Sequence, residues 1–332
     1  MFHRFLNDIR FKIQIRPDGP ILVKAGVDAS GKAQMNFVRT MRGGRQQVYL
    51  PGSSLKGALR AHAESIARTL RGDSVCNPFN THYRKKGENN SPWGLPNCYD
   101  TMSEGSKNLT PTDRFRFSCP ACQLFGSLIS AGHFSASDGY LLEPESTADP
   151  EIRDGVAIDR FSGGTYKSGK FQFEALSDGI FEATLILHNV AWWQVSWIAL
   201  VLRDMCDGML PIGMGTSRGL GRIQTSIEKM TIDLVGFEDD EMIPAIAEMF
   251  EGAEAYGFDQ EDPLIVPDGL VWENRGIRRR LTLEKDRIPP FLTDLYPLFV
   301  RRVQGVTLMQ DWRREQKKSE GLLDLTPSRE VS

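Results

Sequence analysis

The stretch from Tyr49 to Arg60 reads YLPGSSLKGALR, a short apolar strand that passes through a Pro-Gly-Ser-Ser turn into an amphipathic helix. Serine at the start of a helix caps backbone N–H groups that have no partner within the helix. Together with the ammonium of Lys56, those N–H groups form a site that favours anions. The stretch therefore predicts a strand, a tight turn and a helix whose N-terminus can bind phosphate.

A second loop rich in glycine and arginine lies far downstream, where residues 213–222 read GMGTSRGLGR. Glycine lets a backbone approach a ligand closely because it carries no Cβ. Two such basic loops in one chain indicate a ligand with many phosphates, and RNA is the first candidate.

The chain has 332 residues, enough for one large domain or two ordinary ones. No apolar run approaches the ~20 residues that a membrane-spanning helix needs. The N-terminus also lacks the basic and then apolar pattern of a signal peptide. We therefore expect a cytoplasmic protein that does not contact a membrane.

The formal net charge is −3, which argues against a protein that coats nucleic acid by electrostatics alone. Charge is unevenly distributed, with ten carboxylates and no Lys or Arg in residues 238–262 and arginine clusters at 278–280, 301–302 and 313–314. A basic face can therefore coexist with an acidic total, although most runs of charge are only solvated surface.

Alternating apolar and polar residues predict a strand over residues 8–16. A strand and a helix are expected at 48–50 and 53–71, a strand at 132–142, two strands around a Ser-Asp-Gly turn at 171–176 and 180–188, an apolar helix at 190–207 and a last strand at 222–232. This order predicts an α+β fold: a ferredoxin-like (RRM-like) sheet with its helices on one face.

Cysteine clusters in residues 73–122, a polar insertion with little apolar content that holds Cys76, Cys98, Cys119 and Cys122. The last two form a Cys-x-x-Cys knuckle whose thiolates can share one tetrahedral ion. Since such an insertion needs a staple, we expect structural Zn²⁺, with His82 as an alternative ligand. Two pairs of reduced thiols are the competing interpretation. Cys206, at the end of the apolar helix, is expected to be a buried core thiol.

Other sequence motifs for catalysis are absent. There is no His-Glu-x-x-His metal motif, no Walker-type phosphate loop and no defensible Ser/His/Asp triad. Of the five histidines, none lies close in sequence to residues 213–222. His133 is expected to be structural.

Four sequence blocks, taken together and in this order, resemble the repeat-associated mysterious protein (RAMP) superfamily of CRISPR systems. They read PGSSLKGALR at 51–60, CPACQLFG at 119–126, RDGVAIDRFSGG at 153–164 and GTSRGLGR at 215–222. The resemblance spans roughly residues 8–235. It is greatest to the backbone subunit of type III effector complexes, which polymerises along guide RNA.

The resemblance implies that the first helix and the glycine loop grip the sugar-phosphate backbone of a guide RNA. The residues implied to contact RNA are Lys24, Arg39, Ser53, Ser54, Lys56, Arg60, Arg160, Gly213, Gly215, Ser217 and Arg218. A guide-binding protein must accept any sequence, and backbone recognition meets that requirement.

The block at 153–164 resembles the base of the family's thumb, a hairpin that wedges between guide and target RNA; the hairpin is expected over 143–170. Ile158 and Phe161 would then supply wedge or packing surface. The alternative is that both side chains pack the hairpin onto the core.

Active subunits of this kind carry an aspartate in the loop after the first strand, and the matching residue is Asp28, the only acidic residue between Asp18 and Glu64. The resemblance implies Mg²⁺-dependent cleavage of target RNA: the 2′-hydroxyl attacks the adjacent phosphate, leaving a 2′,3′-cyclic phosphate and a 5′-hydroxyl. An aspartate beside glycine and serine is equally ordinary turn chemistry.

These inferences give a core over residues 1–236 and a partly helical C-terminal extension over 237–332. The expected partners are guide RNA, target RNA and the other subunits of the complex. A non-catalytic scaffold of the same fold is the main alternative. A guide-processing endoribonuclease ranks lower, because it would need a histidine near the glycine loop. A zinc-stapled binder of single-stranded nucleic acid is the alternative outside the superfamily.

Overall fold

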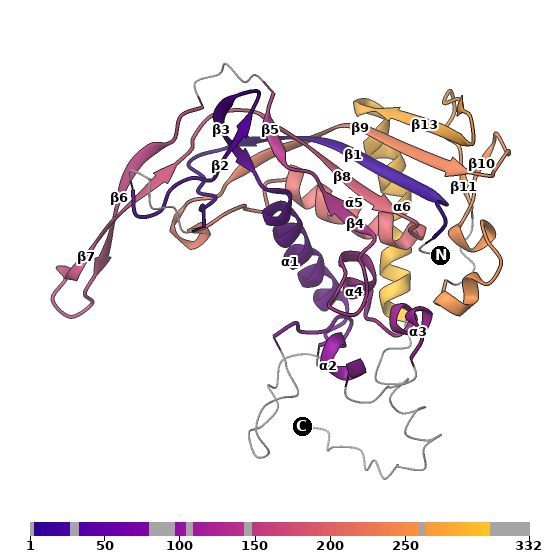
Figure 1. Ribbon diagram of the computed structural model, residues 1–332, viewed down its shortest axis with the longest axis horizontal. Helices are drawn as coiled ribbons and strands as arrows, with labels where there is room; N and C mark the ends of the chain where they lie inside the picture. Colours follow the sequence, from indigo (N-terminus) through magenta and orange to yellow (C-terminus); the bar gives the residue numbers. More distant parts are fainter. Residues whose placement is uncertain are drawn as a thin grey trace, which may run out of the picture.

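One large antiparallel sheet organises the chain (Figure 1). The structure is a computed structural model and describes residues 3–26, 33–79, 97–103, 109–142, 148–258 and 263–305. In these residues the sheet has nine strands, of which β4 (Phe134–Ala136) pairs only with β8. The order of the others is β12 (Glu273–Arg275), β13 (Arg278–Glu284), β9 (Ile223–Val235), β1 (Asn7–Pro17), β8 (Phe181–His188), β5 (Gly139–Leu141), β3 (Arg45–Leu50) and β2 (Arg39–Arg42).

The central strand β1 shows why the two faces of the sheet differ. The side chains on one face are fully buried: Ile9, Phe11, Ile13 and Ile15. On the other face, Arg10 is half-buried and Lys12 is exposed. Successive side chains of a strand point to opposite faces, so this alternation gives β1 one apolar and one charged side.

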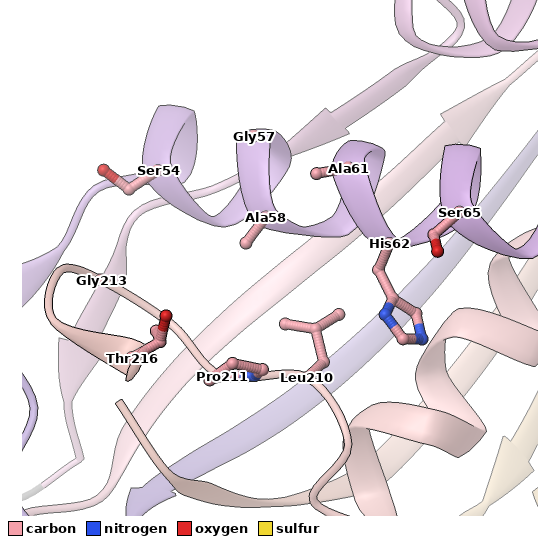
Figure 2. Close-up of a pocket in the computed structure, with 10 residues that line it drawn as sticks. All are labelled: Ser54, Gly57, Ala58, Ala61, His62, Ser65, Leu210, Pro211, Gly213 and Thr216. Atoms are coloured by element: carbon pink, nitrogen blue, oxygen red, sulfur yellow. The ribbon is translucent and has the colours of Figure 1, made fainter. Parts of the chain in front are cut away.

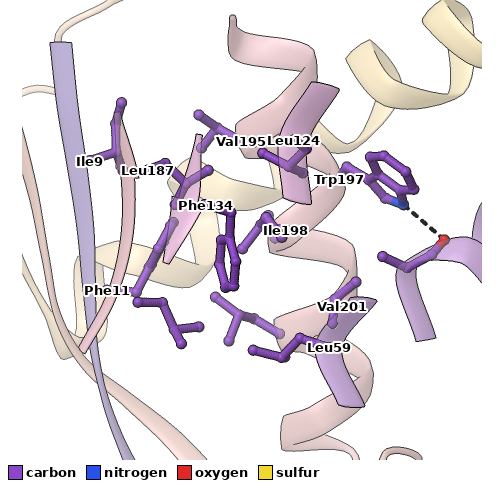
Figure 3. Close-up of a cluster of buried hydrophobic side chains, with 14 of the residues drawn as sticks. Ile9, Phe11, Leu59, Leu124, Phe134, Leu187, Val195, Trp197, Ile198 and Val201 are labelled. Carbon is purple, nitrogen blue, oxygen red and sulfur yellow. Dashed lines mark hydrogen bonds between the residues drawn. The ribbon is translucent and has the colours of Figure 1, made fainter. Parts of the chain in front are cut away.

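Two long helices cover the apolar face: α5 (Trp192–Cys206) and α6 (Ile288–Gly305). The rings of Trp197 on α5 and Phe299 on α6 stack at 4.6 Å. The indole of Trp197 also donates a hydrogen bond of 3.0 Å to the carbonyl of Ala63 on α1 (Gly52–Leu70). Figure 3 shows this bond beside the core that α5 shares with the sheet. The expected α+β sheet with helices on one face is therefore present.

The strands predicted around the Ser-Asp-Gly turn do exist, but they do not pair with each other. β7 (Thr165–Ala175) pairs with β6 (Glu151–Ile158) in a separate hairpin that projects from the body (Figure 1). β8 instead pairs with β1, so that Ile9 lies opposite Leu187. Both predicted strands are thus present, whereas their pairing depends on how the whole sheet packs, which the turn between them does not signal.

Three short helices surround the cysteine-rich segment: α2 (Cys98–Ser103), α3 (Pro111–Arg116) and α4 (Pro120–Phe125). After residue 236 the chain adds β13 to the sheet edge and α6 to α5. It also forms a small ribbon of β10 (Met242–Ile243) and β11 (Leu264–Ile265). Single turns lie at η1 (Thr216–Arg218), η2 (Ile246–Glu248), η3 (Ala253–Tyr256) and η4 (Lys285–Arg287). None of the helices in the described residues is both long and apolar enough to span a membrane.

Candidate nucleic-acid interface and metal centre

The glycine loop between α5 and β9 is clamped to the segment that follows β1. The backbone N–H of Met214 donates to the carbonyl of Leu22 at 2.8 Å, and that of Gly221 donates to Pro20 at 2.9 Å. A Cβ at Gly213 would lie 2.3 Å from the Leu22 carbonyl oxygen, and its φ is +83°. Glycine is therefore required here both for the backbone conformation and for the close approach.

The loop faces α1 across a groove of 550 Å³. The α1 wall presents small side chains and one histidine, and the opposite wall is the chain around the loop (Figure 2). The lining residues are Ser54, Gly57, Ala58, Ala61, His62, Ser65, Leu210, Pro211, Gly213 and Thr216. The structure thus brings together the two stretches that the sequence singled out, although more than 150 residues separate Ser54 from Gly213.

The N-terminus of α1 differs in detail from the expected anion site. The N–H of Gly52 donates to the carboxylate of Asp138 at 2.8 Å, so a negative charge already lies at the helix start. The side chains of Ser53 and Ser54 make no capping bond and are exposed. They offer hydroxyl groups to solvent next to the groove.

Three of the cations implied to bind RNA make hydrogen bonds within the protein. Lys56 donates to the Phe134 carbonyl at 2.9 Å, and burial first, then the nearby Arg60, lowers its pKa. Arg60 donates to Glu64 at 2.8 Å and to the Gly126 carbonyl at 2.9 Å. Arg39 makes a bidentate ion pair with buried Glu174, with N···O distances of 2.7 and 3.0 Å. The other implied RNA contacts that surround the groove and hairpin are exposed or half-buried: Lys24, Ser53, Ser54, Arg160, Gly213, Gly215, Ser217 and Arg218.

The hairpin β6–β7 is anchored at its base and exposed at its tip. Phe161 is 100% exposed and Ile158 is 67% exposed, so neither side chain packs onto the core. At the base, the Phe171 ring covers Gly155, where a Cβ would lie 2.3 Å from the ring. The guanidinium of Arg218 lies 5.6 Å from the same ring, which ties the glycine loop to the hairpin.

Asp28 lies outside the described residues. Nearby, Lys24 forms a β-bridge with Phe37, and Met35 forms one with Phe173 at the base of the hairpin. Before residues 27–32, the chain runs beside the glycine loop, where Leu22 accepts a hydrogen bond from Met214. After them, it runs beside the base of the hairpin, where Met35 donates to Gln172.

The cysteine cluster is the strongest metal-binding arrangement in the described residues. The Sγ atoms of Cys76, Cys98, Cys119 and Cys122 lie within 4.8 Å of one another, and all four residues are buried and free of disulfides. The Sγ atoms of Cys76 and Cys122 are 3.6 Å apart, close to the ~3.8 Å edge of a tetrahedron with Zn–S bonds of about 2.3 Å. His82, the alternative ligand, lies outside the described residues.

The environment of the cluster suits thiolate ligands. Hydrogen bonding with the neighbouring thiols, Cys122 first, holds the pKa of Cys119 well below its usual value, whereas hydrogen bonding to Cys119 raises the pKa of Cys98 and Cys122, so that one thiolate is shared among the thiols. The N–H of Cys119 donates to Sγ of Cys98 at 3.3 Å, and the Arg60 guanidinium approaches Sγ of Cys122 at 3.7 Å. Donors of this kind stabilise the negative charge of a four-thiolate centre. The donor set and geometry therefore fit a divalent metal ion. Cys206, by contrast, is exposed, so the prediction of a buried core thiol was wrong.

One groove residue was missed from sequence alone. His62 lines the groove together with Gly213, and its Nε2 lies 2.8 Å from a carboxylate oxygen of Asp204 on α5. The pair is 142 residues apart, so no local motif signals it. The packing of α1 against α5 places this histidine in the groove wall.

Comparison with known protein families shows which family the chain belongs to. The family model of the RAMP superfamily matches residues 15–224. The chain belongs to the RAMP superfamily. The RAMP match includes α1, the cysteine cluster, the hairpin and the glycine loop, whereas β12, β13 and α6 lie beyond it.

Two further comparisons add little to the RAMP assignment. No curated protein matches the sequence. Among solved structures, a chain of a structure titled "Type IV-B CRISPR Complex" is similar at 16% identity, with 66% of this chain and 90% of that chain covered and a TM-score of 0.41. A likeness of this strength carries no argument about function.

Proposed function

We propose that this RAMP protein is the guide-RNA-binding backbone subunit of a type III CRISPR effector complex. The observation that carries the proposal is the groove between α1 and the glycine loop. Family membership and the order of the four sequence blocks support it. The proposed partners are guide RNA, complementary target RNA and neighbouring subunits.

The walls of the groove suit a sugar-phosphate backbone. Glycine and alanine on α1 leave space for close approach, and the hydroxyls of Ser54 and Thr216 can donate to phosphate oxygens. Exposed Lys24, Arg160, Ser217 and Arg218 extend the interface to the hairpin. None of these groups reads a base, so the interface accepts any guide sequence. The groove therefore supports binding without sequence preference.

The charged face of the sheet is a poorer candidate for RNA. RRM-type proteins stack bases on aromatic side chains of this surface. Here the outward positions of β1 carry Asp8, Arg10, Lys12, Gln14 and Arg16. Their charges are paired, across strands in Lys12–Glu182 at 2.9 Å and within β1 in Arg10–Asp8 at 2.5 Å. Because the face lacks aromatic residues along β1 and its cations are neutralised, we assign RNA to the groove.

The tip of the hairpin has the properties of a wedge. Phe161 and Ile158 expose large apolar side chains far from the body, and Arg160 between them is available for a phosphate. An exposed aromatic ring can take the place of a displaced base in a stack. We assign the hairpin to the guide–target duplex.

We assign structural zinc to the four cysteines, because four buried thiols fit its preferred coordination. Arg60 links this centre to α1. It bonds Glu64 within the helix and also Gly126 at the end of α4, the helix that carries Cys122. Arg68 adds a bond to the Cys76 carbonyl at 2.9 Å. The metal would thereby fix the helix that forms one wall of the groove.

The proposal is tested in the complex reconstituted with its guide and given end-labelled, guide-complementary RNA in Mg²⁺. The Gly57→Glu variant places a carboxylate on the groove wall at a site where a Cβ meets nothing within 4 Å. We expect it to lose guide RNA while it folds normally. Retention of guide RNA by this variant would show that the groove is not the binding site.

Cleavage is tested with the Asp28→Ala variant in the same complex. We expect one cut, which leaves a 2′,3′-cyclic phosphate, to disappear while guide and target binding persist. If every cut survives, the chain is a non-catalytic scaffold of the same complex.

His62 favours a second candidate function, a guide-processing endoribonuclease. That alternative needs a histidine near the glycine loop, and His62 lines the groove with Gly213. Its test is incubation of a guide-precursor RNA with the protein in EDTA. Cleavage that disappears in the His62→Phe variant supports this function, whereas intact precursor excludes it.

A further inference from the structure

His62 and Asp204 form a fixed pair at the groove between α1 and the glycine loop. The Nε2···Oδ2 distance is 2.8 Å, and the side chains are 23% and 14% exposed. The other oxygen of Asp204 bonds the guanidinium of Arg203 at 3.2 Å. The carboxylate therefore has a hydrogen-bonding partner at each oxygen, and the two partners hold it in place.

The pair determines which ring nitrogen carries the proton. A carboxylate only accepts hydrogen bonds, so Nε2 of a neutral imidazole must carry the hydrogen and Nδ1 must be the acceptor. Figure 2 shows the ring projecting from α1 toward the side of the groove where Leu210 lies. The groove-lining neighbours Leu210, Pro211 and Ala61 have no polar side-chain atoms. Ser65, beside His62 in Figure 2, is the polar neighbour on α1. The groove thus contains a hydrogen-bond acceptor that small and mostly apolar side chains leave room to reach.

A nucleotide backbone offers this acceptor one suitable donor. Phosphate oxygens are acceptors and do not bond a neutral Nδ1. Base edges vary with sequence, so they do not suit a protein that accepts any guide. The ribose 2′-hydroxyl is a donor at every nucleotide of RNA and is missing from DNA. We propose that Nδ1 of His62 accepts a hydrogen bond from a ribose 2′-hydroxyl in this groove and so selects RNA over DNA. This inference rests on the proposed function of the groove.

A net hydrogen bond between neutral groups contributes about 1 kcal/mol, which corresponds to roughly a 5-fold change in affinity. The test measures binding of the full-length chain, freed of nucleic acid, to single strands of one sequence made as RNA, as DNA and as 2′-fluoro RNA. The 2′-fluoro strand keeps the sugar pucker of RNA but has no 2′ donor. We expect RNA to bind about 5-fold more tightly than 2′-fluoro RNA.

The His62→Phe variant should remove this difference between the two strands. The matched control is His188→Phe, which breaks another histidine–aspartate pair, His188 with Asp8 at 2.5 Å, on the charged face of the sheet. The control should keep the preference for RNA. If wild-type protein binds both strands equally, or if His62→Phe weakens both by the same factor, the inference is wrong and His62 only ties α1 to α5.

Gly57→Glu separates this inference from the proposed function. If Gly57→Glu still binds RNA, the groove is not the site and the proposed function fails. If Gly57→Glu abolishes binding but His62→Phe keeps the preference for RNA, only the role of His62 fails.

Discussion

The Sγ atoms of Cys76 and Cys122 lie 3.6 Å apart, although 46 residues separate them along the chain. The distance is far longer than the ~2.05 Å of a disulfide and close to that between two thiolates on one zinc ion. Cys98 and Cys119 complete the cluster from a helix start and a helix cap. The short helices α2 and α4 are therefore joined through the cluster to the segment that follows α1.

The first prediction concerns metal content. We expect purified protein to contain one zinc ion per chain by elemental analysis, and the Cys119→Ser variant to contain much less. The variant should also unfold at a lower temperature, because metal binding and folding of a small metal-bound segment are coupled.

Cys206→Ser is the matched control, since Cys206 is exposed and lies outside the cluster. It should keep its zinc and its melting temperature. Equal zinc content in the two serine variants would contradict the assignment of the site.

The second prediction concerns the pair of Arg39 and Glu174. Glu174 is buried and accepts hydrogen bonds from Arg39 and from the N–H of Phe37 at 2.7 Å. Glu174→Ala should lower the free energy of unfolding by about 2 to 3 kcal/mol, because it leaves a partly buried guanidinium and an N–H without this acceptor. Denaturant titration measures the change.

The comparison for this second prediction is Glu182→Ala, which removes the half-buried partner of exposed Lys12 at the sheet surface. An exposed ion pair contributes at most about 1 kcal/mol. A loss at Glu174 no greater than that at Glu182 would show that the buried pair does not stabilise the fold.

The helices and the cysteine cluster were largely predictable from sequence because their signals are local. Expected helix 53–71 is observed at Gly52–Leu70, and expected helix 190–207 at Trp192–Cys206. Proline, glycine and serine mark the start of the first helix, and an apolar run marks the second. The Cys-x-x-Cys knuckle likewise pointed to a cluster that the fold assembles.

What sequence could not predict depends on distant contacts. Arg60 carries a positive charge in a basic motif, but its partner Gly126 comes from a loop 66 residues away. Arg39 likewise bonds Glu174, 135 residues downstream. The pairing of β7 with β6, and the approach of His62 to Asp204, also depend on how the elements pack. The sequence shows that a motif contains a charged residue. It does not show whether that side chain is already hydrogen-bonded within the protein or is available to a ligand.

The third prediction concerns pH and His133. Its Nδ1 lies 2.6 Å from the carbonyl of His188, and its ring meets Phe115 edge-to-face at 5.1 Å. Burial, more than any other cause, lowers its pKa. The unfolded chain binds a proton at this histidine near pH 6.5, whereas the folded chain binds it only at lower pH. Stability from this group is therefore present above about pH 6.5 and is lost as pH falls toward the pKa of the folded state.

The free energy of unfolding should accordingly fall between pH 7 and pH 5, by at most about 1.4 kcal/mol per pH unit from this one proton. His133→Phe should reduce that slope, even if loss of the bond to His188 lowers stability at pH 7. Denaturant titrations of both proteins across this range test the prediction. Identical slopes would mean that His133 is not responsible for any acid sensitivity.

The fourth prediction concerns Gly57, which lies within α1 on the groove wall. A Cβ at this position meets nothing within 4 Å, so Gly57→Ala introduces no clash. Alanine is favoured over glycine inside a helix by about 1 kcal/mol. The variant should therefore be more stable than the natural chain by roughly that amount. Gly57 therefore weakens α1 although the folded chain has room for a side chain at this position. A ligand that occupies the open space in the groove would explain why glycine stands there.

We therefore expect Gly57→Ala to raise the melting temperature and to weaken RNA binding, because the added methyl group narrows the groove. Gly72→Ala is the control, since a Cβ there also meets nothing within 4 Å, but the residue follows the C-terminal end of α1 and does not line the groove. Its RNA affinity should equal that of the natural chain. If Gly57→Ala is stabilised and binds RNA as tightly as before, the missing side chain at residue 57 does not serve RNA.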